Sequence, residues 1–169
     1  LIVLLAGGMV WTSCDLASAG NTAILNANST FPPTVQHRFE YAEEDVVEGK
    51  VMVESKVELD DLDVILSRNG FSRRDVVDAR VDSVRVTHMS GPSLKDVKLF
   101  LRMSAEDTPI AQVQSLPDET SLVVDGRSEP VTAAIQNGAG TLHGRFGVES
   151  PRGGVVRAKV HYRLEVEGV

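Results

Sequence analysis

Six side chains near the C-terminus lie at alternate positions and together could bind an anionic partner. Residues two apart on a β-strand share one face, and the turn at 150–154 would join two such strands into a hairpin. A cationic outward face of this kind could meet a lipid headgroup, a polysaccharide or an acidic protein surface. The six side chains are His143, Arg145, Arg157, Lys159, His161 and Arg163.

The charge balance of the chain supports this reading but leaves an alternative open. The net charge is −7, yet residues 140–169 hold five basic and three acidic side chains, a net of +2 that leaves −9 on the remainder. An ordinary solvated face is the alternative, because charged side chains also protect strands from aggregation. An acidic chain with 5% aromatic residues disfavours nucleic acid as the partner.

The four histidines are candidate metal ligands, and all lie on predicted strands. His143 and His161 would face each other across the hairpin, but a transition-metal site needs a third ligand that the sequence does not place there. We therefore expect solvated strand histidines and no metal site. The other two histidines are His37 and His88.

A cluster of carboxylates could suggest calcium, but helix capping explains it better. Asp60, Asp61 and Asp63 begin a predicted helix over residues 60–70, where carboxylates suit the helix dipole. An EF-hand loop needs a glycine at its sixth position, but counted from Asp60 this chain has Ile65 there. Motifs for a serine nucleophile, a phosphate-binding loop or a dinucleotide site are absent from the sequence. We expect no catalytic residues, no cofactor and no enzymatic activity.

The N-terminus indicates export. Leu1–Val10 is an uncharged apolar run, followed by Thr12, Ser13 and Cys14, the single cysteine. Such a run is typical of a secretory signal peptide and is too short to span a bilayer. The small residues before the cysteine, with Asp15 after it, resemble the lipobox of bacterial lipoproteins.

The lipobox resemblance implies that residues 1–13 are a signal peptide, which we expect to be truncated at its start. It also implies that Cys14 becomes the lipid-bearing first residue, held at the cell envelope on the periplasmic or surface side. Trp11 stands where that motif usually has an aliphatic residue. Ordinary cleavage after Ala19 is the alternative, because Ala17-Ser18-Ala19 fits a signal-peptidase site, and it would release a soluble secreted protein.

Residues 14–34 are predicted to be the lipidated cysteine and a flexible tether. They are rich in Ala, Asn, Ser and Thr, and Pro32-Pro33 lies near their end. Residues 35–169 are long enough for one domain with a sizeable core.

The domain is predicted to be an all-β antiparallel sandwich, immunoglobulin-like or related, with two short helices at 60–70 and 128–136. Apolar and polar residues alternate six times over 156–167, and a parity shift between Val81 and Val84 predicts a bulge. From Leu59 onward the order of elements resembles uncharacterised envelope lipoprotein domains, which implies no activity. Earlier strands are predicted at Val35–Tyr41, Lys50–Leu59, Ala79–His88, Asp96–Met103, Ile110–Leu116 and Ser121–Val124.

The sequence therefore favours an envelope lipoprotein whose sandwich is a binding or structural adaptor module. Its partners would be the membrane, through the N-terminal lipid, and an envelope protein or an anionic glycan or lipid. The alternative is an exported carrier of a small apolar ligand, which would need a cavity of several hundred Å³ between the sheets.

Overall fold

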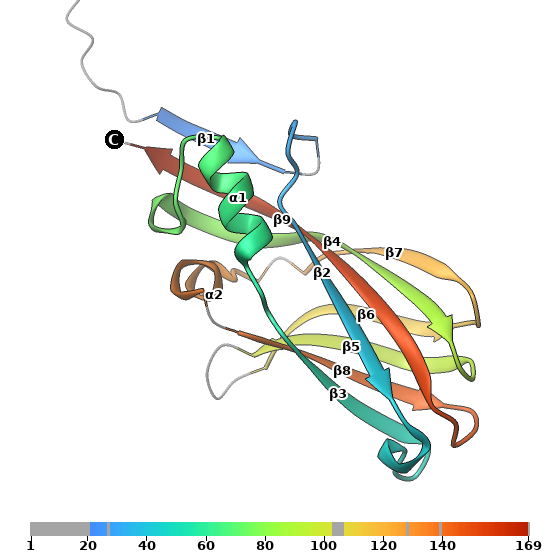
Figure 1. Ribbon diagram of the computed structural model, residues 1–169. Coiled ribbons are helices and arrows are strands. Elements are labelled where there is room, and N and C mark those ends of the chain that lie inside the picture. Colours follow the sequence, from blue (N-terminus) through green and yellow to red (C-terminus); the bar gives the residue numbers. More distant parts are fainter. Residues whose placement is uncertain (1–20, 27, 103–106, 128, 139, 169) are drawn as a thin grey trace, which may run out of the picture.

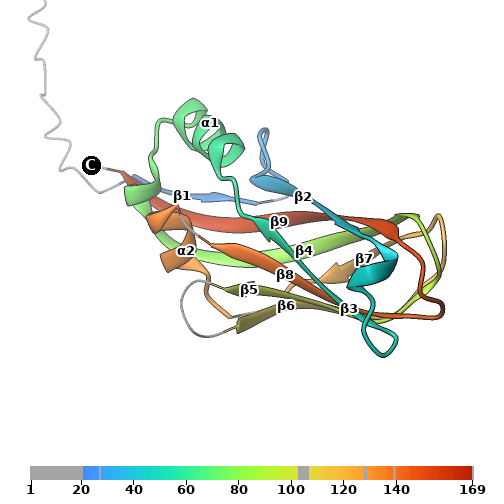
Figure 2. The same cartoon turned by 60° about the horizontal axis from the view of Figure 1, so that its bottom comes forward.

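The computed structural model describes residues 21–168 except 27, 103–106, 128 and 139. Within these residues, nine strands form two packed antiparallel sheets (Figures 1 and 2), so the predicted all-β sandwich is confirmed. The strands are β1 (Asn21–Leu25), β2 (Thr34–Tyr41), β3 (Lys50–Lys56), β4 (Val76–Ser90), β5 (Leu94–Arg102), β6 (Asp107–Leu116), β7 (Ser121–Asp125), β8 (Thr141–Val148) and β9 (Gly154–Gly168). The α-helices are α1 (Asp60–Arg68) and α2 (Thr132–Asn137), and short 3₁₀ turns lie at Glu43–Asp45 and Arg73–Asp75.

Strand β9 organises the first sheet, which we call sheet A. Along one edge β9 pairs with β2 through residues 154–161 and with β1 through residues 164–168. Along its other edge β9 pairs with β4, and β4 pairs with β7. The second sheet, sheet B, has the order β3-β8-β5-β6.

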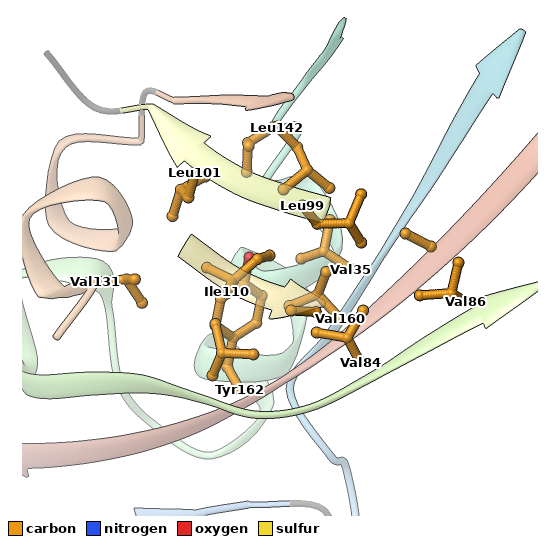
Figure 3. Close-up of a cluster of buried hydrophobic side chains, with 14 of the residues drawn as sticks. Val35, Val84, Val86, Leu99, Leu101, Ile110, Val131, Leu142, Val160 and Tyr162 are labelled. Carbon is orange, nitrogen blue, oxygen red and sulfur yellow. The ribbon is translucent and has the colours of Figure 1, made fainter. Parts of the chain in front are cut away.

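The core lies between the two sheets, where alternate side chains of both point inward. Val84 and Val160 of sheet A face Leu99 and Leu142 of sheet B (Figure 3). This packing follows from the period-2 pattern, because each strand buries one of its two faces.

Both helices cover parts of the sandwich that strands leave open. In α1, Leu62 and Leu66 are buried, and the N–H of Phe71 donates to the carbonyl of Leu66 at 2.9 Å. This helix confirms the prediction for residues 60–70. Helix α2 begins at Thr132, later than predicted, and its segment covers the free edge of β4, where the Val131 N–H donates to the Ala79 carbonyl at 2.7 Å.

The predicted C-terminal hairpin is wrong. Strand β8 pairs with β3 and β5 in sheet B, whereas β9 belongs to sheet A. The turn after β8 therefore crosses from one sheet to the other. The alternation in both segments was correctly assigned to one buried face each, but alternation does not specify which strand lies alongside, and both segments face one core from opposite sides.

The predicted tether is also wrong in its C-terminal part. Residues 21–25 form β1, with Leu25 buried opposite Leu164, and β2 already begins at Thr34. Five residues are too few for a recognisable alternation. Cys14, the apolar run before it and Ala17-Ser18-Ala19 lie outside the described residues.

The predicted bulge is confirmed by a register shift between Val81 and Ser83 in β4.

Candidate interaction surface

The structure divides the six predicted cationic residues between two opposite surfaces. Arg157, Lys159, His161 and Arg163 lie on the outer face of sheet A, because they alternate with the buried residues of β9. His143 and Arg145 belong to β8 in sheet B. The prediction of one shared face is therefore wrong, since the hairpin on which it depended does not form.

The outer face of sheet A receives further basic side chains that the sequence prediction missed. Arg38 of β2 lies directly opposite Arg157, and Arg85 and Arg80 of β4 lie opposite Lys159 and Arg163. Strand parity placed these arginines on an outward face, but only the register brings them beside β9. We call the following set the cationic face: Arg38, Arg80, Arg85, Arg157, Lys159, His161 and Arg163.

Three directly opposed pairs of like charge are an unfavourable arrangement. Such pairs destabilise a sheet by a few tenths to about 1 kcal/mol each. Carboxylates relieve two positions: Arg38 Nε lies 2.6 Å from Glu40 Oε1, and Arg80 Nε lies 2.8 Å from Asp78 Oδ2. Among the residues that the structure describes, Arg85 and the three basic side chains Arg157, Lys159 and Arg163 form no ion pair.

His161 lies within the cationic face and hydrogen-bonds to β2. Its Nδ1 lies 3.1 Å from Thr34 Oγ1. Partial burial lowers the pKa of His161 below its ordinary value, and the nearby charges of Lys159 and Arg85 lower it further. An anion bound here would oppose these charges and raise the pKa.

Charge changes sign along β9. The stretch from Arg157 to Arg163 is basic, whereas Glu165 and Glu167 follow at the end where β1 pairs, and Asp78 of β4 lies opposite Glu165. At about 3.4 Å per residue, the basic stretch is roughly 20 Å long. The outer face of sheet A is therefore divided into a basic region and an acidic end next to β1.

On sheet B, Arg145 shares a carboxylate with a second arginine. Its Nη2 lies 3.2 Å from Asp107 Oδ2, and Arg102 Nε donates to Asp107 Oδ1 at 2.7 Å. The hydrogen bond from Arg102, with the positive charges around it, lowers the pKa of Asp107. The Arg145 guanidinium also lies over the Phe100 ring, 4.8 Å from its centroid, so it is engaged within the sheet.

The expectation of four solvated histidines is wrong for three of them. His143 is only 2% exposed: it lies between Glu54 and Phe100 in the register, with Nδ1 3.2 Å from Glu54 Oε1. His37 and His88 are buried on the inner face of sheet A. The His37 Nδ1 lies 3.3 Å from Ser55 Oγ of β3, and burial lowers the pKa of His37 to about 4.

A metal site between His143 and His161 is excluded by the fold, because these residues lie in different sheets. Within the described residues, no group of three His, Cys, Asp or Glu side chains is placed to hold a metal ion. The described helices also include none long and apolar enough to cross a membrane.

A groove of about 720 Å³ lies on the outer side of sheet B. Gly147 leaves space there between β3 and β5, and Met52 and Val47 supply apolar wall. It differs from the enclosed cavity that a carrier would need, because it lies outside the sandwich and charged side chains stand among its apolar ones. The charged residues lining it are Asp45, Lys50, Asp96, Lys98 and Arg145.

Comparisons with known proteins give distant structural similarities. No family model and no curated protein sequence matches the chain. A chain of the Nora virus structure aligns with a TM-score of 0.42 and 10% identity over 97% of this chain and 64% of that one. A chain of the infectious bursal disease virus structure (Gt strain) aligns with a TM-score of 0.22 and 9% identity, over 98% of this chain and 47% of that chain. The chain thus spans less than two thirds of either viral chain.

Proposed function

We propose that this protein is a bacterial envelope lipoprotein, anchored through a lipid on Cys14, whose β-sandwich is a binding module for an anionic partner. The apolar run and the small residues before the single cysteine support the anchor. The cationic face of sheet A supports the mode of binding, and it is the observation on which the proposal depends.

The opposed basic pairs explain why an anionic partner fits this face. Arg38 with Arg157 and Arg85 with Lys159 repel each other in the free protein. A negative group bound between two such side chains attracts both of them. Binding therefore offsets the like-charge repulsion that destabilises the folded sheet. A solvated face with no partner would retain the repulsion without any gain.

Neither the carrier alternative nor an enzymatic role has comparable support. The groove on sheet B lies outside the sandwich and mixes charged with apolar side chains. The Nδ1 atom of buried His37 lies 3.3 Å from the Ser55 hydroxyl, but the described hydrogen bonds include no third group that orients this pair for nucleophilic catalysis. A binding module therefore accounts for the observations best.

The binding mode is tested by photo-crosslinking in cells. A photoreactive residue replaces Gln36, a neutral outward position opposite Lys159, and the product, whether lipid, glycan or protein, is identified by mass spectrometry. The double variant Arg157→Glu/Arg163→Glu should lose the crosslink. The matched control Lys56→Glu/Arg127→Glu makes the same charge change at exposed positions off the cationic face and should keep it; an undiminished crosslink in the first variant contradicts the proposal.

The anchor is tested separately by the mass of the mature N-terminus. A diacylated or triacylated Cys14 is expected, and a Cys14→Ser variant should lose the lipid. A mature chain that begins with a free Gly20 contradicts the anchor and identifies a soluble secreted protein.

A further inference from the structure

We infer that the anionic partner of the cationic face is the headgroup surface of the same membrane that holds the lipid on Cys14. The inference deepens the proposed function and rests on its anchor. It assigns sheet A as the membrane-facing side of the domain and sheet B as the side facing away.

The first argument is the point of attachment. Only residues 15–20 separate Cys14 from β1. The seven Cα–Cα intervals from Cys14 to Asn21 span at most about 25 Å when the chain is fully extended. Strand β1 pairs with β9, which carries four of the residues of the cationic face. The lipid is therefore joined by a short link to the sheet whose outer surface is basic, at the end where β1 begins and β9 ends (Figure 1).

The second argument is distance. Asn21 lies opposite Gly168, five residues from Arg163 along β9, which is roughly 17 Å. The basic region therefore begins within the reach of the link. If sheet A lies along the membrane, the whole region meets the headgroups, and a charged surface acts within about one Debye length, some 10 Å.

The third argument is the composition of the face. Val123 of β7 lies directly opposite Arg85, and it is 55% exposed. A basic surface with an exposed apolar side chain suits a bilayer interface, where the cation meets a headgroup and the apolar group approaches the acyl boundary. A soluble polyanion offers nothing to Val123.

The fourth argument concerns orientation. Glu165 and Glu167 adjoin the attachment end, and negative headgroups repel them. The domain should therefore tilt, so that the row of Arg38 and Arg157 approaches the membrane most closely. In this position the groove on sheet B, with Met52 and Lys98, remains open to the aqueous side.

The test places an environment-sensitive fluorophore on either side of the sandwich. The full lipidated protein is reconstituted in vesicles of phosphatidylcholine alone or mixed with anionic phosphatidylglycerol. Lipid occupies the Cys14 thiol, so one introduced cysteine takes the label: Thr87→Cys on sheet A, opposite Arg157, or Gln112→Cys on sheet B, opposite Lys98. Quenching by acrylamide, a neutral aqueous quencher, reports exposure to water.

We expect several-fold slower quenching at position 87 on anionic vesicles than on neutral ones, and no change at position 112. High salt, or Arg157→Glu/Arg163→Glu in the same chain, should abolish the difference. Equal quenching at position 87 on both vesicles overturns the membrane assignment. If the crosslink at position 36 then proves to join a protein or glycan, the proposed function stands with that partner; if it also fails, both fall.

Discussion

The outer faces of the two sheets both carry basic side chains, but they differ in how those side chains are paired with carboxylates. On sheet B, Arg102 and Arg145 converge on Asp107. On sheet A, Arg85 faces Lys159 across neighbouring strands, without an ion pair among the described residues. The comparison shows that the number of basic residues does not identify a binding face, because the register decides whether their charges cancel or accumulate.

The difference is one of electrostatic potential more than of stability. Ion pairs at a protein surface contribute about 0–1 kcal/mol, so Asp107 adds little to the fold, while its single negative charge offsets one of the two guanidinium charges that meet there. Sheet A instead presents a potential that extends into solvent and attracts negative groups. Substitutions of charged residues on either sheet test this difference.

The largest expected effect is on binding to anions. Arg85→Glu/Lys159→Glu should weaken the affinity for a soluble polyanion such as dextran sulfate by about 2–4 kcal/mol, since each basic residue near an anionic surface contributes about 1 kcal/mol and reversal adds repulsion. Titration calorimetry at low salt measures this. Arg102→Glu/Arg145→Glu, the corresponding change on sheet B, should have a smaller effect, because Asp107 already offsets part of this charge; equal losses would remove the distinction between the faces.

Acid should weaken the contact that joins the two sheets. His37 of sheet A lies beside Ser55 of sheet B, and burial lowers the pKa of His37 to about 4. Above pH 6.5, the ordinary histidine pKa, it is neutral in both states and costs nothing. As pH falls from 6.5 to 4 the unfolded chain binds the extra proton, so about 3 kcal/mol of stability is lost.

Chemical denaturation at a series of pH values measures this loss, and His37→Leu should show a shallower pH dependence than the unmodified protein. Identical pH profiles for the two proteins would show that His37 is not held neutral by the fold. The arginines and the lysine of the cationic face should retain their charge throughout this range, because these side chains do not titrate there.

Removing one carboxylate should make sheet B resemble sheet A. Asp107→Asn leaves Arg102 and Arg145 without their shared partner, so polyanion binding should increase by roughly 1 kcal/mol. The loss of stability should stay within about 1 kcal/mol, as for other exposed pairs. Unchanged binding would show that the ion pairs with Asp107 do not weaken the binding of anions to sheet B.

The smallest effect is on the stability of sheet A. Arg85→Gln should stabilise the protein by a few tenths to about 1 kcal/mol, because it removes repulsion from Lys159. It should also raise the pKa of His161, which the Arg85 charge helps to lower. Thermal unfolding and an NMR titration of His161 measure the two effects, and Arg145→Gln on sheet B should not stabilise.

Local patterns were sufficient to predict most elements of the fold. The alternation over 156–167 predicted β9, and three carboxylates before an apolar stripe predicted α1. Strand β1 escaped prediction because its five residues, Asn21–Leu25, are too short to show a period and resemble a linker in composition. The burial of His143 escaped it too, because Glu54 and Phe100, which flank it, come from two other strands.

The sequence by itself determined the sandwich class, the buried apolar face of most strands, and the lone cysteine after an apolar run. These properties follow from composition and from periods of a few residues. Only the tertiary structure decided that β8 and β9 belong to different sheets, and thus that Arg145 is separated from Arg157 while Arg38 and Arg85 join it. The physical reason is that alternation determines which side chains are buried, whereas strand pairing depends on contacts between residues far apart in the chain.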